Sequence, residues 1–218
     1  MAAWSATEDF EYSVGLLNTQ SGGSGWSAGW SADAGLTVVS SPTFSGTGAC
    51  GVGSGLAGCD GSRTLTTAVN SGIVRVYFYA TNLPTAQKGF YPAVLKEGGT
   101  ARFYVAWGAN PFNDNEIGIL GSTSISLSTS LSAATWYYID IELDQAGGSR
   151  ARVSLNGGAW SSYVTANGGS FTTIDSYRIT SGDGNATDQG YVVDNIGVGT
   201  GPAAAAVSIK RRMLTGIA

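Results

Sequence analysis

Three acidic side chains, Asp140, Glu142 and Asp144, alternate with the apolar residues Ile141 and Leu143. In an extended chain alternate residues project from one face, so the three carboxylates would stand in a row. Glycoside hydrolases use carboxylates arranged in this way, one as nucleophile or base and another as proton donor. A solvent-facing strand without a catalytic role carries the same residue types, so the residues opposite the acids decide between the two interpretations.

The next segment predicts which residues lie opposite. Gln145–Ser149 contains two glycines and is typical of a loop that joins the two strands of a hairpin. In the resulting register each acid faces a basic or polar side chain: Asp144 opposite Arg150, Glu142 opposite Arg152, and Asp140 opposite Ser154. Arginines there would keep the pKa values of the carboxylates low, whereas a glycosidase needs one proton donor with a raised pKa. We therefore expect the acids to be structural and the protein not to be an enzyme.

The composition of the 218-residue chain argues against several other functions. The chain has no histidine, which is the usual base for serine and cysteine nucleophiles and the commonest transition-metal ligand. Its 11 lysines and arginines and its net charge of −4 argue against a nucleic-acid partner, because phosphate binding needs clustered positive charge. No apolar stretch approaches the length of a membrane span, so we expect no membrane insertion.

Apolar and polar residues alternate with a period of two along most of the chain, and Gly, Asn, Asp or Ser clusters separate the alternating runs. The predicted strands include residues 64–69, 72–81, 101–108, 116–120, 124–128, 136–144, 150–157, 176–182 and 190–199. This pattern predicts an all-β fold, a two-sheet antiparallel β-sandwich. We expect one domain over residues 1–201, followed by a short linker and tail at 202–218.

The order of several segments resembles that of concanavalin A-like (laminin G-like) jelly-roll domains. The Trp-led strand, the glycine-containing loop and RVSLNGG resemble their central hairpin, and RTLTTAVNSGIVRVYFYAT their second pair of strands. EDFEYSVGLLNTQSGGSGWSAGW resembles their opening strand and Trp-Gly-rich loop, and YVVDNIGVGTG the closing strand that lies beside the first. The resemblance covers residues 8–201 and implies a jelly roll of the lectin and glucanase superfamily. Its laminarinase-like members carry two glutamates around an aspartate, whereas here two aspartates flank Glu142.

A jelly roll of this kind favours a glycan-binding function, for which an aromatic ring and fixed polar groups must meet. The loop WGANPFNDN supplies the glycan-binding candidates Trp107, Asn110, Asn113 and Asp114. The segment GWSAGW carries two more rings, Trp26 and Trp30, but the matching family positions are structural. We expect those two rings to plug the end of the sandwich.

The sequence leaves a metal site and a disulfide open. The resemblance places acids of the first strand, such as Glu11, beside Asp194 of the last strand, where related modules often bind a structural calcium. Solvated acids at the strand ends are the alternative. Cys50 and Cys59 are spaced for a small loop-closing disulfide, with two free thiols as the alternative.

The end of the chain reads as a spacer, PAAAA, followed by the basic and apolar segment VSIKRRMLTGIA. Exposed apolar side chains on a solvated tail would be a liability, so the segment favours a docking peptide over a disordered terminus. The residues expected to contact a partner are Ile209, Lys210, Arg211, Arg212, Met213, Leu214 and Ile217.

A sugar-binding jelly roll with a docking tail, and with an N-terminal sequence that lacks the features of a secretory signal, fits the surface of a phage virion. We expect a non-catalytic capsid-decoration or tail protein, made in the host cytoplasm, that contacts other virion proteins through its tail. Its further partners would be cell-surface or environmental glycans and other copies of itself in a homo-oligomer. A secreted, extracellular carbohydrate-binding module is the alternative interpretation, and a laminarinase-like glycoside hydrolase is the third.

Overall fold

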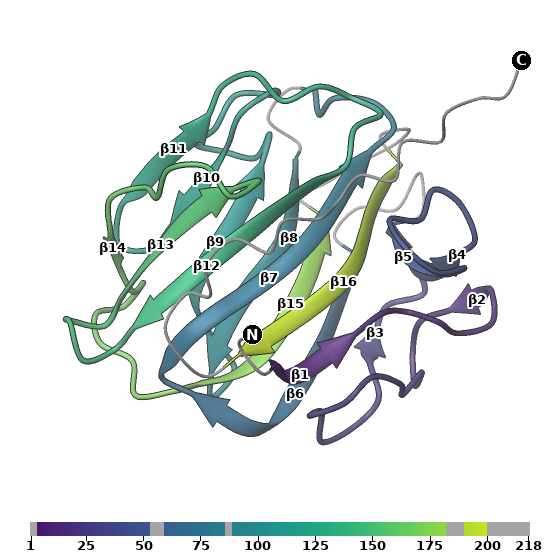
Figure 1. The fold of residues 1–218 in the computed structure, drawn as a ribbon, viewed down its shortest axis with the longest axis horizontal. Helices are drawn as coiled ribbons and strands as arrows, with labels where there is room; N and C mark the ends of the chain where they lie inside the picture. Colours follow the sequence, from purple (N-terminus) through teal and green to yellow (C-terminus); the bar gives the residue numbers. More distant parts are fainter. Residues whose placement is uncertain (1–3, 53–58, 86–88, 182–189, 200–218) are drawn as a thin grey trace, which may run out of the picture.

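Two antiparallel sheets packed face to face form the part of the chain that the computed structural model describes, residues 4–52, 59–85, 89–181 and 190–199 (Figure 1). The predicted all-β, two-sheet sandwich is confirmed. These residues form no helix, and so none of them forms a helix that could cross a membrane. Residues 202–218, the predicted linker and tail, lie outside the described residues.

Figure 1 looks onto the nine-stranded sheet, which contains the first and the last strand side by side, as the resemblance implied. In spatial order its strands are β14 (Val164–Thr165), β13 (Arg150–Leu155), β12 (Tyr137–Asp144), β7 (Ser71–Ala80), β16 (Tyr191–Gly199), β5 (Ala49–Val52), β4 (Leu36–Val39) and β2 (Gly15–Leu16), with β1 (Trp4–Glu8) paired to β16.

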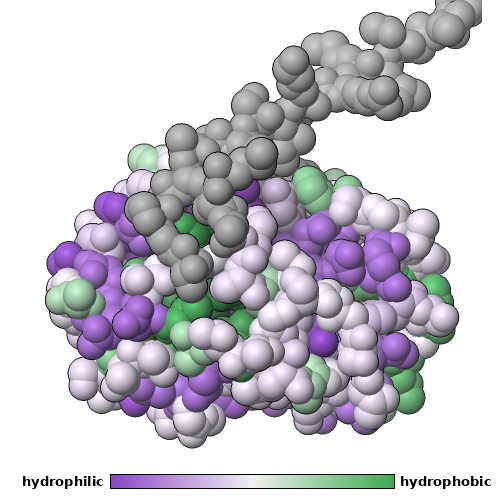
Figure 2. Space-filling model, turned by 60° about the horizontal axis from the view of Figure 1, so that its bottom comes forward, coloured by the Kyte–Doolittle hydropathy of each residue, from purple (hydrophilic) through white to green (hydrophobic). Residues whose placement is uncertain are grey.

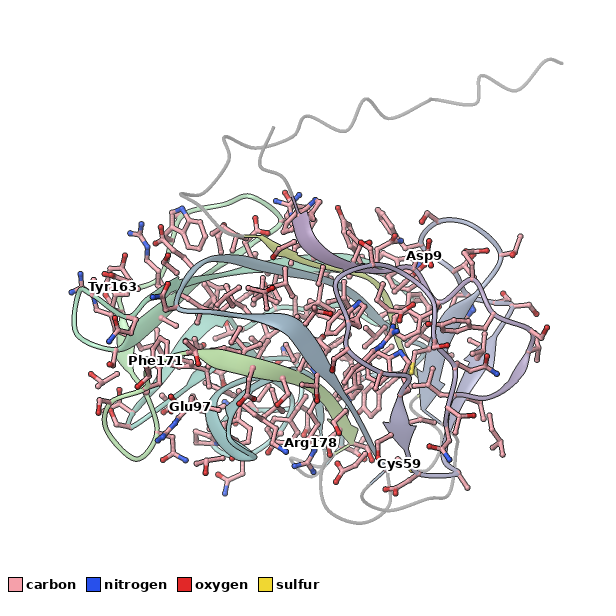
Figure 3. All side chains as sticks on the ribbon, turned by 90° about the horizontal axis from the view of Figure 1, so that it is seen from below. Asp9, Cys59, Glu97, Tyr163, Phe171 and Arg178 are labelled. Atoms are coloured by element: carbon pink, nitrogen blue, oxygen red, sulfur yellow. The ribbon has the colours of Figure 1, made fainter. Side chains whose placement is uncertain are left out.

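The seven-stranded sheet lies behind it and covers one of its faces. Its strands, in spatial order, are β11 (Ser124–Ser128), β10 (Ile117–Leu120), β9 (Thr100–Trp107), β8 (Phe90–Glu97), β15 (Ile174–Ser181), β6 (Asp60–Val69) and β3 (Ser31–Ala32). Figure 3 shows the two layers edge-on, with Asp9 and Tyr163 on the side of the nine-stranded sheet and Glu97 and Arg178 on the opposite side.

The hairpin of β12 and β13 shows how alternation builds the core between the sheets. Ile139, Ile141 and Leu143 are almost completely buried, and they pack with Ala151 and Val153 of the next strand. The register is the one predicted from the sequence: Asp144 opposite Arg150, Glu142 opposite Arg152, and Asp140 opposite Ser154. The side chains between the apolar ones therefore point away from the core.

A buried polar network connects β1 to the seven-stranded sheet. Glu8 is 1% exposed, and its carboxylate accepts hydrogen bonds from the Phe10 N–H at 2.8 Å and the Trp30 indole at 3.0 Å. It also accepts a hydrogen bond from the Tyr12 hydroxyl at 2.8 Å and forms an ion pair with Arg63 of β6. Trp30 is itself buried, which agrees with the structural role expected for it.

Strand β8 is one that the alternation pattern did not predict. Its third residue is Pro92, which cannot donate a backbone hydrogen bond and normally excludes a central strand. The pairing of β8 with both neighbours shifts register around this proline, so it sits at a bulge where the missing donor is tolerated. Pro92 therefore interrupts the sequence signal of a strand without preventing the strand from forming.

No disulfide joins Cys50 and Cys59, so of the two possibilities that their spacing left open the structure has the one without a bond. Cys50 lies on β5 of the nine-stranded sheet with its side chain in the core, and burial raises the pKa of its thiol well above the ordinary value. Cys59 leads into β6 of the opposite sheet and lies on that side of the molecule in Figure 3. The spacing in sequence had not revealed that Cys50 lies within a strand of one sheet and Cys59 just before a strand of the other.

Candidate functional site

The nine-stranded sheet has an outer face, which we define as the face turned away from the seven-stranded sheet. Its central strands carry aromatic and charged side chains there in an ordered grid. Tyr77 of β7 lies opposite Tyr138 of β12, and Arg75 lies opposite Asp140. Around these, the outer face also carries Tyr79, Glu142, Asp144, Arg150 and Arg152 from the strands, and Phe44, Trp136, Trp160 and Tyr163 from the loops.

Each carboxylate of the row on β12 is held by an arginine. Arg75 binds Asp140 through two parallel bonds, Nε to Oδ1 at 2.6 Å and Nη2 to Oδ2 at 2.7 Å. Arg150 binds Asp144 at 2.8 Å, and an ion pair also joins Arg152 to Glu142. Two of these pairs are the predicted cross-strand ones, whereas the partner of Asp140 is an arginine on the other neighbouring strand.

Aromatic rings form a continuous series at one end of the grid. Phe44 stacks on Tyr77 with 4.0 Å between the ring centroids, and Tyr77 lies 5.3 Å from Tyr138. Trp136 meets Phe44 edge-on at 5.7 Å and Tyr79 at 5.3 Å. Since Phe44 is 38% exposed, the series presents ring surface to solvent.

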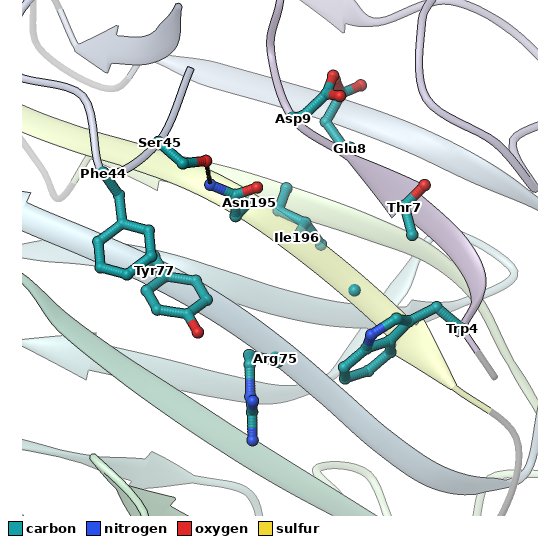
Figure 4. A pocket seen from close by; sticks show the side chains of 11 residues that line it. Trp4, Thr7, Glu8, Asp9, Phe44, Ser45, Arg75, Tyr77, Asn195 and Ile196 are labelled. Carbon is teal, nitrogen blue, oxygen red and sulfur yellow. Dashed lines mark hydrogen bonds between the residues drawn. The ribbon is translucent and has the colours of Figure 1, made fainter. Parts of the chain in front are cut away.

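A pocket of about 420 Å³ lies between this series and a further ring, Trp4 of β1 (Figure 4). Its floor is β16, where Gly197 allows the Trp4 ring to lie directly on the strand: a Cβ at Gly197 would come within 2.8 Å of the ring. Arg75 lines the pocket, with its guanidinium carbon 6.0 Å from the Trp4 centroid and 4.7 Å from that of Tyr138. The pocket therefore combines exposed rings with fixed polar groups.

The loop that carries Phe44 is held by two carboxylates. Asp194 is buried, and its Oδ2 accepts hydrogen bonds from the backbone N–H groups of Phe44 at 2.9 Å and Ser45 at 3.1 Å. Glu11 accepts hydrogen bonds from the Thr47 N–H at 2.9 Å and the Thr47 hydroxyl at 2.7 Å. Figure 4 shows a further bond, from the Asn195 amide to the Ser45 hydroxyl, at 2.6 Å.

The surroundings of Asp194 act on its pKa in opposite directions. Burial raises the pKa of Asp194 to about 6, against the backbone N–H donors of Ser45, Phe44 and Asn195, which lower it. Glu11, a like charge nearby, also raises this pKa. For the exposed Glu11, the hydrogen bonds from Thr47 lower the pKa.

Glu11 and Asp194 are neighbours, as expected, and a structural calcium beside them stays a prediction. Calcium takes six or more oxygen ligands, whereas these carboxylates face N–H and O–H donors. Among the described residues, no group of three or more acidic or other metal-ligating side chains comes together. In the structure both acids hold the loop that carries Phe44.

Comparisons with known proteins give matches in structure but not in sequence. No family model matches the chain, and the search of curated proteins finds no match. The carbohydrate esterase of the Shiga toxin-encoding bacteriophage phi24B is similar with a TM-score of 0.55 and 18% identity, over 90% of this chain and 98% of that one. Lectin II from Ulex europaeus is similar with a TM-score of 0.51 and 13% identity, over 77% and 90% of the two chains. The fold is a concanavalin A-like jelly roll.

Another similar jelly roll is the endo-β-1,4-glucuronan lyase of the fungus Trichoderma reesei, with a TM-score of 0.55 and 12% identity over 91% of this chain and 96% of that one. The three proteins differ in what their names say they do: an esterase, a lyase and a lectin. At these identities the similarity establishes the fold alone.

The prediction that Trp107 binds a glycan was wrong. Trp107 is completely buried, packed edge-on against Phe78 at 5.7 Å and Tyr137 at 6.0 Å, so its ring has no free face for a sugar. It faces inward because β9 alternates, and Trp107 falls on the same side as the buried Val105.

The rest of that loop lies at the end of β9, in the seven-stranded sheet, away from the outer face of the jelly roll. Asn110 and Asn113 are exposed, and Asp114 is half-buried. The backbone and side-chain nitrogens of Asn113 both donate to Glu116 at 2.9 Å, which holds the turn. A ligand at these three residues stays a prediction. The docking residues from Ile209 to Ile217 lie outside the described residues.

Sequence reasoning did not find the arginine and the aromatic residues that line the pocket of the jelly roll. Arg75 had the clearest signal, because it is a single charged residue inside the apolar strand GIVRVYFYA. Phe44, in the Ser- and Gly-rich SPTFSGTG, and Trp4, near the start of the chain, were single aromatic residues outside any recognised pattern. Their proximity depends on pairing between strands that are distant in sequence.

Proposed function

We propose that the protein is a non-catalytic, glycan-binding jelly roll and that the outer face, centred on the pocket between Trp4 and Phe44, is its sugar-binding surface. The observation that carries the proposal is the pocket itself, which places partly exposed rings at both ends and Arg75 between them. Rings bind the apolar faces of sugars, while fixed donors and acceptors bind the hydroxyl groups. The lectin neighbour is in keeping with this function.

The state of the carboxylates on the outer face supports binding rather than catalysis. Glycoside hydrolysis needs an acid with a raised pKa, whereas each acid of β12 is paired with an arginine. Two hydrogen bonds lower the pKa of Asp144: the one from Arg150 has the larger effect, and the one from the Gly147 N–H the smaller. An assay of sugar or acetyl release from polysaccharides tests the alternative that the protein is an enzyme. Turnover by the wild type that disappears in Asp140→Asn or Glu142→Gln would overturn our proposal in favour of that alternative.

A binding assay on the full chain tests the proposed surface. We expect affinity electrophoresis in gels containing soluble polysaccharides to show retardation of the wild type and at least a tenfold weaker effect for Trp4→Ala. Leu16→Ala is the matched control, because Leu16 is an exposed apolar residue of β2 that does not line the pocket. Equal retardation of both variants would place the sugar elsewhere, and Asn113 would then be the next residue to change.

We further propose that the jelly roll is displayed on a phage particle and attached through residues 207–218. The basic and apolar sequence of this segment and the phage esterase among the structural neighbours support this setting. Removal of residues 207–218 should abolish co-sedimentation with phage particles while glycan binding is retained. If the truncated chain still sediments with the particles, another surface attaches it; if neither chain does, a secreted carbohydrate-binding module becomes the better interpretation.

A further inference from the structure

The positive charge that faces the pocket is already neutralised. Arg75 is the one arginine among the described lining residues of this pocket, and both of its bonds to Asp140 are shorter than 2.8 Å. Glu8, another lining residue, is paired with the buried Arg63. Asp9 also lines the pocket and is exposed, so the charge around the pocket is negative once the ion pairs are taken together.

The rest of the outer face repeats this pairing. Arg150 and Arg152 of β13 are bound by Asp144 and Glu142, and their guanidinium groups stack on the Tyr163 ring at 4.1 and 4.8 Å. A sulfate, phosphate or uronate group that approached either arginine would meet a guanidinium whose charge a bound carboxylate already balances. The chain as a whole carries a net charge of −4, which adds long-range repulsion.

The rings, by contrast, are arranged for more than one sugar unit. Trp4 lies over Gly197 on β16, while the loop of Phe44 is held by Asp194, three residues earlier on the same strand, so the two rings stand at opposite ends of the pocket. Trp136 and Tyr79 extend the aromatic series beyond Phe44. A ligand that contacts both ends must pass over Arg75 and the Asn195 side chain, which offer hydrogen-bonding groups between the rings.

We infer that the ligand is an uncharged glycan chain, bound through at least two consecutive sugar units, and that the ion pairs of the outer face select against acidic polysaccharides. This inference rests on the proposed glycan-binding function. Neutral hydroxyl groups can bond to Arg75 without separating it from Asp140, whereas an anionic sugar meets a guanidinium whose charge is already balanced and the exposed Asp9 as a like charge. The ion pairs thus make the surface specific for neutral over acidic glycans.

The test compares neutral and acidic oligosaccharides on the full chain by isothermal titration calorimetry. The neutral probes are hexasaccharides of β-1,3-glucan, β-1,4-glucan, xylan, mannan and arabinan; the acidic probes are oligomers of glucuronan, alginate and polygalacturonate. We expect at least one neutral hexasaccharide to bind at least tenfold more tightly than every acidic probe and than its own monosaccharide. Its affinity should change less than twofold between roughly 0.05 and 0.5 M NaCl, because no net charge is screened.

A gain-of-function variant tests the role of the ion pair directly. Asp140→Asn keeps the size of the side chain but leaves the Arg75 guanidinium without its counter-charge. We expect this variant to acquire binding to glucuronan oligomers that disappears in 0.5 M NaCl, and a variant that gains no such binding would contradict the role of the ion pair. Asp144→Asn, which releases an arginine remote from the pocket, is the matched control and should not acquire binding at the pocket.

The possible results separate the inference from the function it rests on. Tighter, salt-sensitive binding of an acidic oligomer by the wild type would overturn the inferred ligand class and leave the glycan-binding function intact. A monosaccharide that binds as well as its hexasaccharide would overturn the multi-unit contact. If the wild type binds none of the probes and Asp140→Asn gains nothing, the proposed function itself fails.

Discussion

Arg75 shows why individual residue types matter on the outer face. Its planar guanidinium forms two parallel bonds with Asp140 and at the same time lies over the Tyr138 ring. A lysine has neither the forked donors nor the flat surface for this double role. Hydrogen bonding to Asp140 raises the pKa of Arg75, which keeps the side chain charged and the pair closed. The rings around the pocket are therefore held by a group that is itself fixed.

Asp194 gives a residue-scale prediction about pH. Because burial raises the pKa of Asp194 from 3.8 to about 6, the folded protein binds this proton more tightly than the unfolded chain does. The stability contributed by this group is present below about pH 4 and is lost as the pH rises through about 6. The wild type should therefore lose unfolding free energy relative to Asp194→Asn between pH 4 and 7. Urea titrations at both pH values check this, and a relative gain with pH would mean that the backbone N–H donors outweigh burial.

At the scale of elements, the β12–β13 hairpin was predictable and the pocket was not. The alternation and the loop Gln145–Ser149 determine the register locally, so the faces and two of the ion pairs followed from sequence alone. The Arg75–Asp140 pair required β7 to lie beside β12, and the Trp4–Phe44 pocket required β1 to pair with β16. Contacts between strands so distant in sequence leave no periodic signal.

The burial of Trp107 shows that the direction of a side chain at the end of a strand is hard to predict from sequence. Trp107 was grouped with the polar residues of the loop that follows, although the predicted strand at residues 101–108 includes it; it is the last residue of β9 and points into the core. Alternation counted from Phe103 would have placed it inward, together with Val105. Element ends are where a pattern of two gives the least evidence, because a shift of one residue reverses the direction of the side chain.

The two faces of the hairpin give an element-scale prediction. Leu143 is 2% exposed in the core, so Leu143→Ala should lower the unfolding free energy by about 2–5 kcal/mol through lost burial and a residual cavity. Glu142→Gln, one residue earlier on the outer face, removes a partly exposed ion pair and should cost less than about 1 kcal/mol. Urea unfolding of both variants measures the difference. Equal losses would contradict the assignment of the two faces.

At the scale of the whole molecule, Figure 2 shows a face on which apolar and hydrophilic residues are mixed. On the side shown there, hydrophilic and intermediate residues surround small, separate apolar areas. The described part of the chain instead concentrates ring surface on the outer face of one sheet, over strands that come from both ends of the sequence. The jelly roll closes by pairing β1 with β16, so its stability and its pocket depend on the same junction.

The buried Glu8–Arg63 pair at this junction gives the final prediction. Glu8→Gln would leave the Arg63 guanidinium, whose side chain is 3% exposed, without a counter-charge between the sheets. Removing one partner of a buried pair costs about 3–5 kcal/mol, and for a chain of this size that lowers Tm by roughly 6–20 °C. Asp9→Asn is the matched control, since Asp9 is exposed and the hydrogen bond that it accepts from the Glu11 N–H is long at 3.5 Å. Calorimetry should therefore show a much lower Tm for Glu8→Gln than for Asp9→Asn. Because Glu8 also lines the pocket, Glu8→Gln should bind glycans more weakly as well. An unchanged Tm would mean that the two sheets are held together without this pair.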